Sequence, residues 1–269
     1  MRLAIRHTTE YRYSHPARHT IQYLRLTPPS NDSQTVIEWR IRAPGRLTRQ
    51  VDGFGNIMNV LVVDGAHDGI SIAVAGVVES HDTVGVTPAV DERPSPILYL
   101  RPTDLTVPTV AVRDFAEPLR ARVADDRLDG LHELSRAVAR AVAYRPGTTD
   151  VATTAGAALT AGTGVCQDQA HVFTAAARLL GVPTRYVSGY VHVHGTGADE
   201  TASHAWSEAW VESLGWVAFD VTNEICANDA HVRLAVGPDY LSCAPVRGMR
   251  RGGGEEALAV NVRVAATDQ

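Results

Sequence analysis

The spacing of apolar residues changes along the chain, and this change limits the folds that the sequence can adopt. In the first part, apolar and polar residues alternate, as from Leu3 to Tyr13, which is the period of strands with one buried face. Asp52-Gly53 and Gly55-Asn56 interrupt the alternation with residues that accept turn conformations at little cost. We therefore predict an all-β domain, a small sandwich or barrel, over residues 1–82.

Further along the chain, apolar residues recur at helical spacing. One helix is predicted from Leu131 to Val142, followed by a short one over Thr153–Thr160 and a third over Cys166–Leu180. Alternating segments then return, and they are Arg185–His194, His204–Val211, Trp216–Val221 and Leu258–Val264. Helices followed by antiparallel strands are the α+β pattern, and not the βαβ alternation of a doubly wound fold.

Residues 83–108 carry five prolines. Because proline removes a backbone donor and blocks helix formation, we interpret this segment as a linker that lies over a surface. The predicted organisation is therefore a β domain at 1–82, a Pro-rich linker at 83–108, and a core of helices packed on an antiparallel sheet at 109–269. The last alternating segment, Leu258–Val264, is assigned to that core.

Charge and cysteine usage narrow the class of protein. The net charge is −5 and there is no long basic run, which argues against a nucleic-acid partner. No window approaches the roughly 18 uncharged apolar residues of a membrane span, and Met1 to His7 lack the apolar run of a secretory signal. The odd number of cysteines, with no Cys-x-x-Cys pair, argues against a disulfide framework. We expect a cytoplasmic protein.

A glycine-rich turn, Gly162-Thr163-Gly164-Val165, delivers Cys166 to the first turn of a predicted helix. The unpaired N–H groups and the positive end of the helix dipole stabilise a thiolate there. Since the thiolate is the nucleophilic form of cysteine, Cys166 is a candidate nucleophile. A buried structural cysteine is the alternative interpretation of this segment taken alone.

His204 and Asp220 lie in a predicted β-hairpin whose turn runs from Glu212 to Gly215. Folding that hairpin brings the imidazole and the carboxylate onto adjacent strands, nearly opposite each other, although one residue of slip would change the face. A carboxylate beside an imidazole holds its tautomer and leaves the other nitrogen for a thiol. Considered singly, each residue has an alternative role, as an ordinary strand histidine or a turn aspartate.

Three motifs together resemble the core of the transglutaminase-like superfamily. In chain order they are Gly164-Val165-Cys166-Gln167-Asp168, His204-Ala205-Trp206-Ser207-Glu208-Ala209-Trp210 and Gly215-Trp216-Val217-Ala218-Phe219-Asp220-Val221-Thr222-Asn223. The opening segment, Thr8 to Tyr13, is similar to the β domain that precedes bacterial transglutaminase-like cores. The resemblance implies a papain-like fold with Cys166 as nucleophile, His204 as base and Asp220 as the orienting carboxylate.

The shape of the substrate pocket and the identity of a second oxyanion donor depend on residues around the predicted triad. Gln169 stands where an aromatic residue is expected in many relatives, which affects the expected pocket shape and not the triad. Between Thr109 and Val165 there is no Gln, Asn or Trp to assist the backbone N–H of Cys166 as an oxyanion donor. Tyr144 is the best neutral donor there, with packing as its alternative role. Three tryptophans could line a substrate groove, with core packing as the alternative: Trp206, Trp210 and Trp216.

Three classes of function follow from these residues. The first is an enzyme that forms a Cys166 thioester with a peptide or carboxamide carbonyl. Water is the preferred acceptor, because free cross-linking would damage a cytoplasm and because bacterial relatives are regarded as proteases. Transamidation by an amine stays open, since a chain without lysine cannot cross-link itself through lysine.

The second class is a non-catalytic binding module, against which the intact triad argues. The third is a metallohydrolase built on histidines outside the triad, namely His171, His192, His194 and His231. No His-Glu-x-x-His motif is present, so we expect neither a metal nor a cofactor. The expected partner is a peptide, protein or small amide substrate, with no nucleic acid and no membrane, and the oligomeric state is left open.

Overall fold

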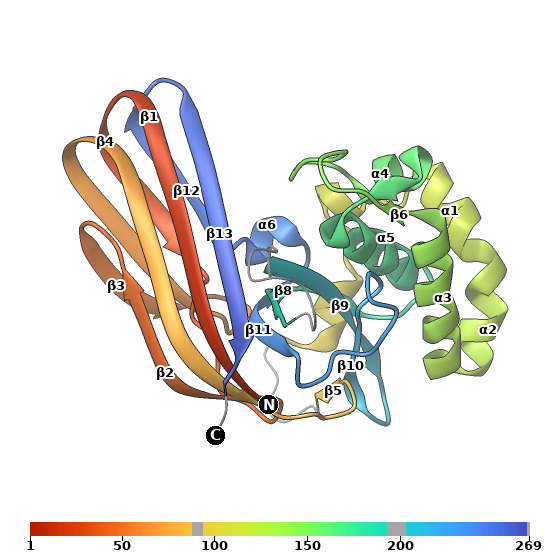
Figure 1. Ribbon diagram of the computed structural model, residues 1–269. Helices are drawn as coiled ribbons and strands as arrows, with labels where there is room; N and C mark the ends of the chain where they lie inside the picture. Colours follow the sequence, from red (N-terminus) through yellow and green to blue (C-terminus); the bar gives the residue numbers. More distant parts are fainter. Residues whose placement is uncertain (88–93, 193–202, 268–269) are drawn as a thin grey trace.

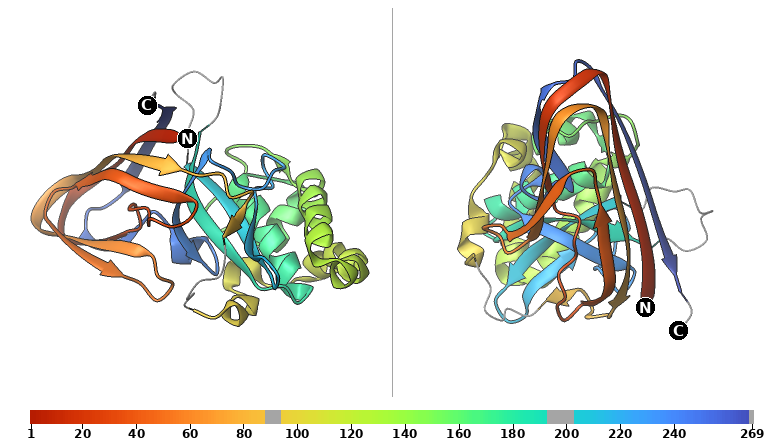
Figure 2. Two further views of the ribbon diagram at one scale, coloured as in Figure 1. Left: turned by 90° about the horizontal axis from the view of Figure 1, so that it is seen from below. Right: turned by 90° about the vertical axis from the view of Figure 1, so that its left-hand side faces the viewer.

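The computed structural model describes residues 1–87, 94–192 and 203–267. Three parts follow one another across the molecule: an N-terminal sheet, a second antiparallel sheet and a group of helices (Figures 1 and 2). The predicted α+β fold class is confirmed.

The N-terminal sheet is built on two very long antiparallel strands. Strands β1 and β4 turn over at the top of Figure 1, so that the sheet folds back on itself. The β1–β4 ladder is irregular between Arg12 and His19, where β1 turns. Alternate residues from Leu3 to Tyr13 are buried, as their period predicted. The strands are β1 (Arg2–Leu24), β2 (Gln34–Arg42), β3 (Arg46–Val51), β4 (Ile57–Ser80), β12 (Val246–Gly252) and β13 (Glu256–Ala266).

The end of the chain completes this sheet, which corrects the predicted extent of the core over 109–269. Strand β12 pairs with Ala17–Leu24 of β1, and β13 pairs with Leu3–Tyr13. The segment Leu258–Val264 is therefore a strand, as predicted, but it belongs to the N-terminal sheet. A period of two specifies a half-buried strand and says nothing about its partner, so the sequence pattern could not distinguish the two sheets.

The second sheet takes its edge from the predicted linker. Its strand order is β11-β8-β9-β10-β5, and β5 (Val86–Thr87) pairs with Trp216 and Val217. Two short 3₁₀ helices, η1 (Pro96–Leu100) and η2 (Asp104–Thr106), follow in the linker, whose residues 88–93 lie outside the described part. The other strands are β8 (Thr184–Val191), β9 (Ser203–Val211), β10 (Gly215–Phe219) and β11 (His231–Gly237).

The helices pack around α5, which lies against β8 and β9 and is buried along most of its length. Its apolar cluster takes residues from the other helices, on the side away from the N-terminal sheet (Figure 2), and from β9 and β10. The helices are α1 (Val110–Ala116), η3 (Glu117–Leu119), α2 (Arg120–Asp125), α3 (Arg127–Ala141), α4 (Ala155–Ala161), α5 (Cys166–Leu179) and α6 (Tyr240–Cys243). Within the described ranges, no helix has both the length and the apolar character needed to cross a bilayer.

Two buried side-chain amides join the sheets. Gln34 Nε2 donates to the Arg233 carbonyl at 2.9 Å, and the Arg233 N–H donates to Gln34 Oε1 at 2.8 Å. Asn56 makes the same pair of bonds with Val236, both at 2.8 Å. Because β11 is an edge strand, these amides satisfy backbone groups that a neighbouring strand would otherwise bind.

Candidate active site

Cys166 is the first residue of α5, and the turn before it is held by Asp168. The Asp168 carboxylate accepts from the Val165 N–H at 2.8 Å and from the Thr149 hydroxyl at 2.6 Å. A side chain at Gly164 would collide with this carboxylate, since an added Cβ would lie 2.7 Å from Asp168 Cβ. The glycine-rich turn is therefore needed for close approach to the first turn of the helix. The Cys166 side chain is partly exposed.

His204 lies at the start of β9, and Asp220 follows β10 directly. His204 Nε2 and Asp220 Oδ2 are 2.7 Å apart, and both side chains are buried. His204 lines the same cleft as Cys166, and its remaining nitrogen, Nδ1, is not engaged by Asp220. The structure thus joins His204 to Asp220 by a hydrogen bond and brings Cys166 and His204 to the lining of one cleft.

The His204 imidazolium and the Asp220 carboxylate stabilise each other's charged forms. Burial alone lowers the pKa of His204, but the hydrogen bonds to Asp220 and Cys166 and the charges of both residues outweigh it and raise this pKa to about 10. Burial raises the pKa of Asp220, yet the bonds from His204 and His231 reverse the effect and hold it well below its usual value. At neutral pH the site therefore contains an imidazolium hydrogen-bonded to a carboxylate, beside the Cys166 side chain.

His231 is a second histidine on the same carboxylate, and it was considered in the sequence only as a possible metal ligand. Its Nε2 lies 2.9 Å from Asp220 Oδ2. Its other ring nitrogen, Nδ1, contacts Asn228, at 3.2 Å from the backbone nitrogen and 3.1 Å from the side-chain Oδ1. No local sequence pattern predicted the contact between His231 and Asp220, because β11 reaches this position through its pairing with β8.

Asn223 completes the donors around Asp220. Its Nδ2 donates to Asp220 Oδ2 at 2.6 Å, and its backbone N–H donates to Oδ1 at 3.2 Å. An Asp followed three residues later by Asn is a local Asx-type pattern, so this contact could have been found in the sequence. Asp220 is fully buried and accepts from three side chains, which fixes its orientation toward His204.

The same atoms are the ones that a metal ion would need. Ligand atoms of His204, Asp220 and His231 lie within 4.8 Å of one another. They are already joined by hydrogen bonds, which an ion would have to replace. His192 Nδ1 lies 3.2 Å from the Val264 carbonyl, whereas His194 lies outside the described residues. His171 is buried beneath α6, where its Nε2 accepts from the Tyr240 N–H.

Two further sequence candidates are Tyr144 and Gln169. Tyr144 is half-exposed, and its backbone pairs with Gly164 in the short β6–β7 ladder (Ala143–Tyr144 and Thr163–Gly164). Its oxyanion role stays a prediction. Gln169 is buried, and it binds the Val142 carbonyl at 2.8 Å and the Thr222 hydroxyl at 2.6 Å. It therefore ties α5 to the segment after Asp220 instead of shaping a pocket.

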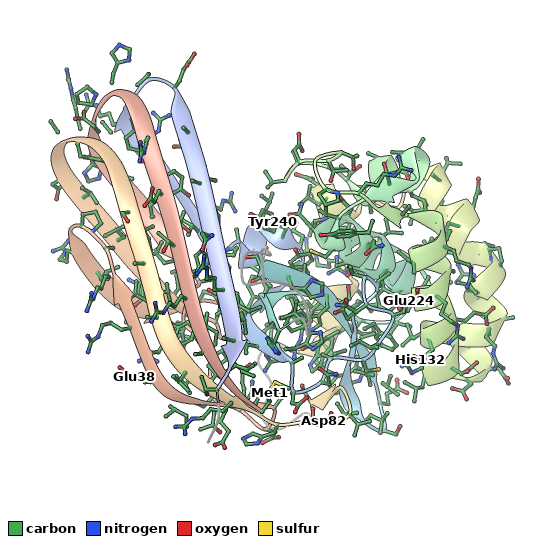
Figure 3. The ribbon with its side chains drawn as sticks, in the orientation of Figure 1. Met1, Glu38, Asp82, His132, Glu224 and Tyr240 are labelled. Atoms are coloured by element: carbon green, nitrogen blue, oxygen red, sulfur yellow. The ribbon has the colours of Figure 1, made fainter. Side chains whose placement is uncertain are left out.

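A cleft of about 270 Å³ opens beside Cys166, between the N-terminal sheet and the core. Figure 3 shows Tyr240 of α6 in this region, between the N-terminal sheet and α5. The N-terminal sheet contributes residues of β1 and β13, namely His7, Thr9, Tyr11, Leu258 and Val260. None of the three tryptophans considered in the sequence is among the described residues that line the cleft.

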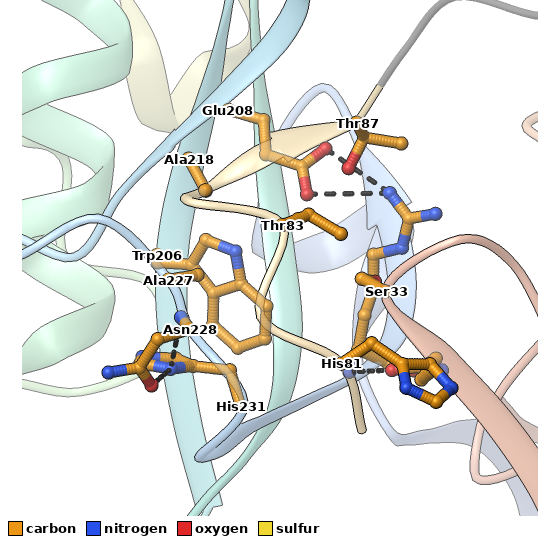
Figure 4. Close-up of a pocket in the computed structure, with 13 residues that line it drawn as sticks. Ser33, His81, Thr83, Thr87, Trp206, Glu208, Ala218, Ala227, Asn228 and His231 are labelled. Atoms are coloured by element: carbon orange, nitrogen blue, oxygen red, sulfur yellow. Dashed lines mark hydrogen bonds and ion pairs between the residues drawn. The ribbon is translucent and has the colours of Figure 1, made fainter. Parts of the chain in front are cut away.

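A smaller cavity of about 30 Å³ borders His231 and Trp206 (Figure 4). Glu208 and Arg233 form an ion pair in its wall, at 3.4 Å. The indole N–H of Trp206 is buried and has no hydrogen-bond partner in the described part of the chain. The cavity has room for a water molecule, the smallest partner that such a group can take.

The fold and the constellation define a papain-like thiol class, and comparison with known proteins identifies the family. The family model described as the transglutaminase-like superfamily matches residues 113–221, and the bacterial transglutaminase-like N-terminal region matches residues 3–79. This chain belongs to the transglutaminase-like superfamily.

Two curated relatives match along nearly the whole chain. An uncharacterized protein of Mycobacterium leprae is 34% identical over 98% of this chain and 98% of its own. An uncharacterized protein of Mycobacterium tuberculosis H37Rv is 30% identical over 92% of this chain and 87% of its own. Among solved structures, a candidate cysteine protease from Cytophaga hutchinsonii has a TM-score of 0.78 at 20% identity, and the match covers 100% of this chain and 91% of that one. At that identity the likeness is one of fold.

Proposed function

We propose that this chain is an enzyme that forms a thioester on Cys166 with a peptide or carboxamide carbonyl. Membership of the transglutaminase-like superfamily supports thiol-dependent chemistry in general. The observation that carries the specific proposal is the His204–Asp220 hydrogen bond, with His204 and Cys166 side by side in the lining of one cleft. Each of the three groups has the neighbour that its proposed role requires.

In the proposed reaction the Cys166 thiolate attacks the carbonyl carbon. A C–S bond forms, the C–N bond breaks, and the His204 imidazolium gives its proton to the leaving amine. Water then gives a proton to His204, and its oxygen attacks the thioester carbonyl. The carboxylic acid leaves, and the thiolate–imidazolium pair is restored. Asp220 stays ionised throughout and stabilises the imidazolium.

Water is the acceptor that the site favours. A transamidating site has to attract an amine and exclude water. The described residues around the cleft include no Asp or Glu side chain that would bind a protonated amine. Hydrolysis, as by a cysteine protease or amidase, is therefore our choice, and transamidation is the other outcome of the test.

The test is a partition experiment with a glutamine-containing peptide and rising cadaverine, with Cys166→Ala as the inactive control. We expect free acid as the main product at every amine concentration, together with an acyl adduct on Cys166 by intact mass. Predominant amine adduct at millimolar cadaverine would make the protein a transamidating enzyme. Absence of any adduct or product would remove the enzyme proposal.

A further inference from the structure

Strand β13 has one paired edge and one free edge, and the pairing pattern identifies which backbone groups point outward. At one end the Ser14 N–H donates to the Glu255 carbonyl at 3.0 Å, and at the other the Thr267 N–H donates to the Arg2 carbonyl at 2.9 Å. Antiparallel strands alternate between residues that bond their partner and residues that do not. The odd-numbered residues of β13 therefore bond β1, and the even-numbered ones direct both N–H and C=O to the free edge.

Leu258 and Val260 belong to the outward set. In the described part of the chain, no strand follows β13 on this side, and no other group bonds the backbone of these two residues. At Val264 the outward carbonyl is instead close to His192 Nδ1, at 3.2 Å. Among the described residues, the edge is thus occupied at one end and unpaired at the end that borders the cleft.

The side chains of these residues form one wall of the cleft. Leu258 pairs with Tyr11 and Val260 pairs with Thr9, so the four side chains share one face of the sheet. All four line the cleft together with Cys166 and His204. Leu258 is 56% exposed and Val260 is 44% exposed. Proteins normally protect an unpaired strand edge of this kind. Its exposure beside the Cys166 thiol therefore indicates that the edge binds another strand.

Among the described lining residues, His204 is the one side chain that carries a charge beside Cys166. Although 20% of the chain is charged, the described lining residues include no Arg, Asp or Glu. Burial lowers the pKa of His7 to about 4, so this lining histidine is neutral at neutral pH. A substrate residue in the cleft gains contact with apolar side chains and meets no fixed counter-charge.

We propose that the substrate is an extended polypeptide that pairs with the β13 edge at Leu258 and Val260 and carries uncharged, apolar residues there. The polypeptide adds a strand to the N-terminal sheet and presents a carbonyl to Cys166. Main-chain bonds supply affinity, and contacts with Tyr11, Leu258 and Val260 select the side chains. This inference rests on the proposed function for the chemical step, and it narrows the substrate from any amide to a polypeptide strand.

The test measures binding and needs no turnover. The Cys166→Ala protein is titrated with a fluorescently labelled, uncharged hexapeptide, Ala-Val-Leu-Gln-Val-Ala, and dissociation constants are read from anisotropy. Adding Val260→Pro removes one outward N–H without touching the β1 ladder, and it should weaken binding ~10-fold. The matched control is Ala266→Pro, which removes an outward N–H on the same edge away from the cleft and should leave binding unchanged. Val260→Ala isolates the loss of the side chain.

A second measurement addresses the strand geometry directly. Methylating the peptide nitrogens one at a time should weaken binding at alternate positions, because alternate residues of an added strand face β13. Replacing leucine by aspartate in the peptide should weaken binding ~10-fold or more. Equal effects of Val260→Pro and Ala266→Pro, no alternation, or no binding of any peptide would each overturn the edge proposal. Binding with this pattern but without thioester in the wild-type protein would instead overturn the proposed chemistry alone.

Discussion

At the scale of single residues, Asp220 is the centre of the candidate site. It is fully buried, and its Oδ2 accepts from His204, His231 and Asn223. A buried carboxylate is stable only when it is well hydrogen-bonded, and these donors meet that requirement. Their arrangement holds the His204 ring with Nδ1 free for the thiol.

Replacing this carboxylate tests the arrangement. We expect Asp220→Asn to lower Cys166-dependent turnover of a glutamine-containing peptide by ~10²-fold or more, because an amide neither stabilises the imidazolium nor selects its tautomer. Circular dichroism should confirm that the variant is folded. Wild-type turnover in a folded Asp220→Asn protein would remove Asp220 from the mechanism.

The pair of His204 and Asp220 makes the free energy of unfolding depend on pH. The folded-state pKa of His204 is raised to about 10. Its contribution to the free energy of unfolding is therefore complete below its ordinary pKa of about 6.5 and is lost as the pH rises toward 10. Asp220, whose pKa is lowered, contributes above about 4 and loses its contribution in stronger acid. We expect the urea-unfolding free energy of the wild type to fall by at least ~1 kcal/mol from pH 6 to pH 9. The fall should be smaller in Asp220→Asn, and equal slopes would contradict the assignment.

The three cysteines should differ in reactivity. Burial raises the pKa of both Cys226 and Cys243, and Cys243 is fully buried, whereas Cys166 is partly exposed beside an imidazolium. We predict that iodoacetamide at pH 6 modifies Cys166 first, as measured by peptide mapping at short times. His204→Gln should abolish this preference. Earlier modification of Cys226 or Cys243 would contradict the prediction.

At the scale of elements, the turn before α5 determines where the thiol lies. Gly164 permits Asp168 to approach the backbone, and Asp168 in turn accepts the Val165 N–H that the helix leaves unpaired. The dipole of α5 and its first free N–H groups then face the thiol. The position of Cys166 is therefore a property of a local motif, and it was predicted from that motif.

Adding one methyl group should disturb this turn. We expect Gly164→Ala to displace the Asp168 carboxylate, to reduce the unfolding free energy by ~1–3 kcal/mol, and to slow Cys166 alkylation. Gly53→Ala is the matched control, since an added Cβ at Gly53 meets nothing within 4 Å. Alkylation at the wild-type rate in Gly164→Ala would show that the turn does not position the thiol.

At the scale of the whole molecule, the N-terminal sheet is one wall of the candidate site and not an appended domain. Both ends of the chain meet in it, because β13 pairs with β1 (Figure 1). The buried amides of Gln34 and Asn56 connect it to β11, the strand that carries His231. The shape of the cleft therefore depends on contacts between residues far apart in the sequence.

Removing these amides should loosen the contact between the sheets. We expect Gln34→Ala and Asn56→Ala each to lower the unfolding free energy by ~1–3 kcal/mol, because each leaves buried backbone groups of β11 unpaired. Hydrogen exchange should show the loss of protection at Arg233 and Val236. Gln50→Ala, at an exposed glutamine of β3, is the control and should be neutral. A neutral effect of the buried substitutions would mean that water replaces the amides.

The sequence by itself determined the features that depend on neighbours along the chain. Period-two alternation predicted the buried face of β1, helical spacing predicted α3 and α5, and the motif before α5 predicted the place of Cys166. The hairpin of β9 and β10 is also local, so the approach of His204 to Asp220 was predicted with it. In each case the interacting groups are joined by a short stretch of chain whose geometry the residues themselves restrict.

Only the tertiary structure decided which distant elements meet. The strand pattern of Leu258–Val264 fits either sheet, and the choice of β1 as its partner depends on which edge is free after folding. His231 reaches Asp220 because β11 pairs with β8, which no local pattern encodes. The open edge of β13 beside Cys166 is likewise a product of the assembled fold, because hydrogen bonding and burial across long sequence separations depend on the whole packed molecule.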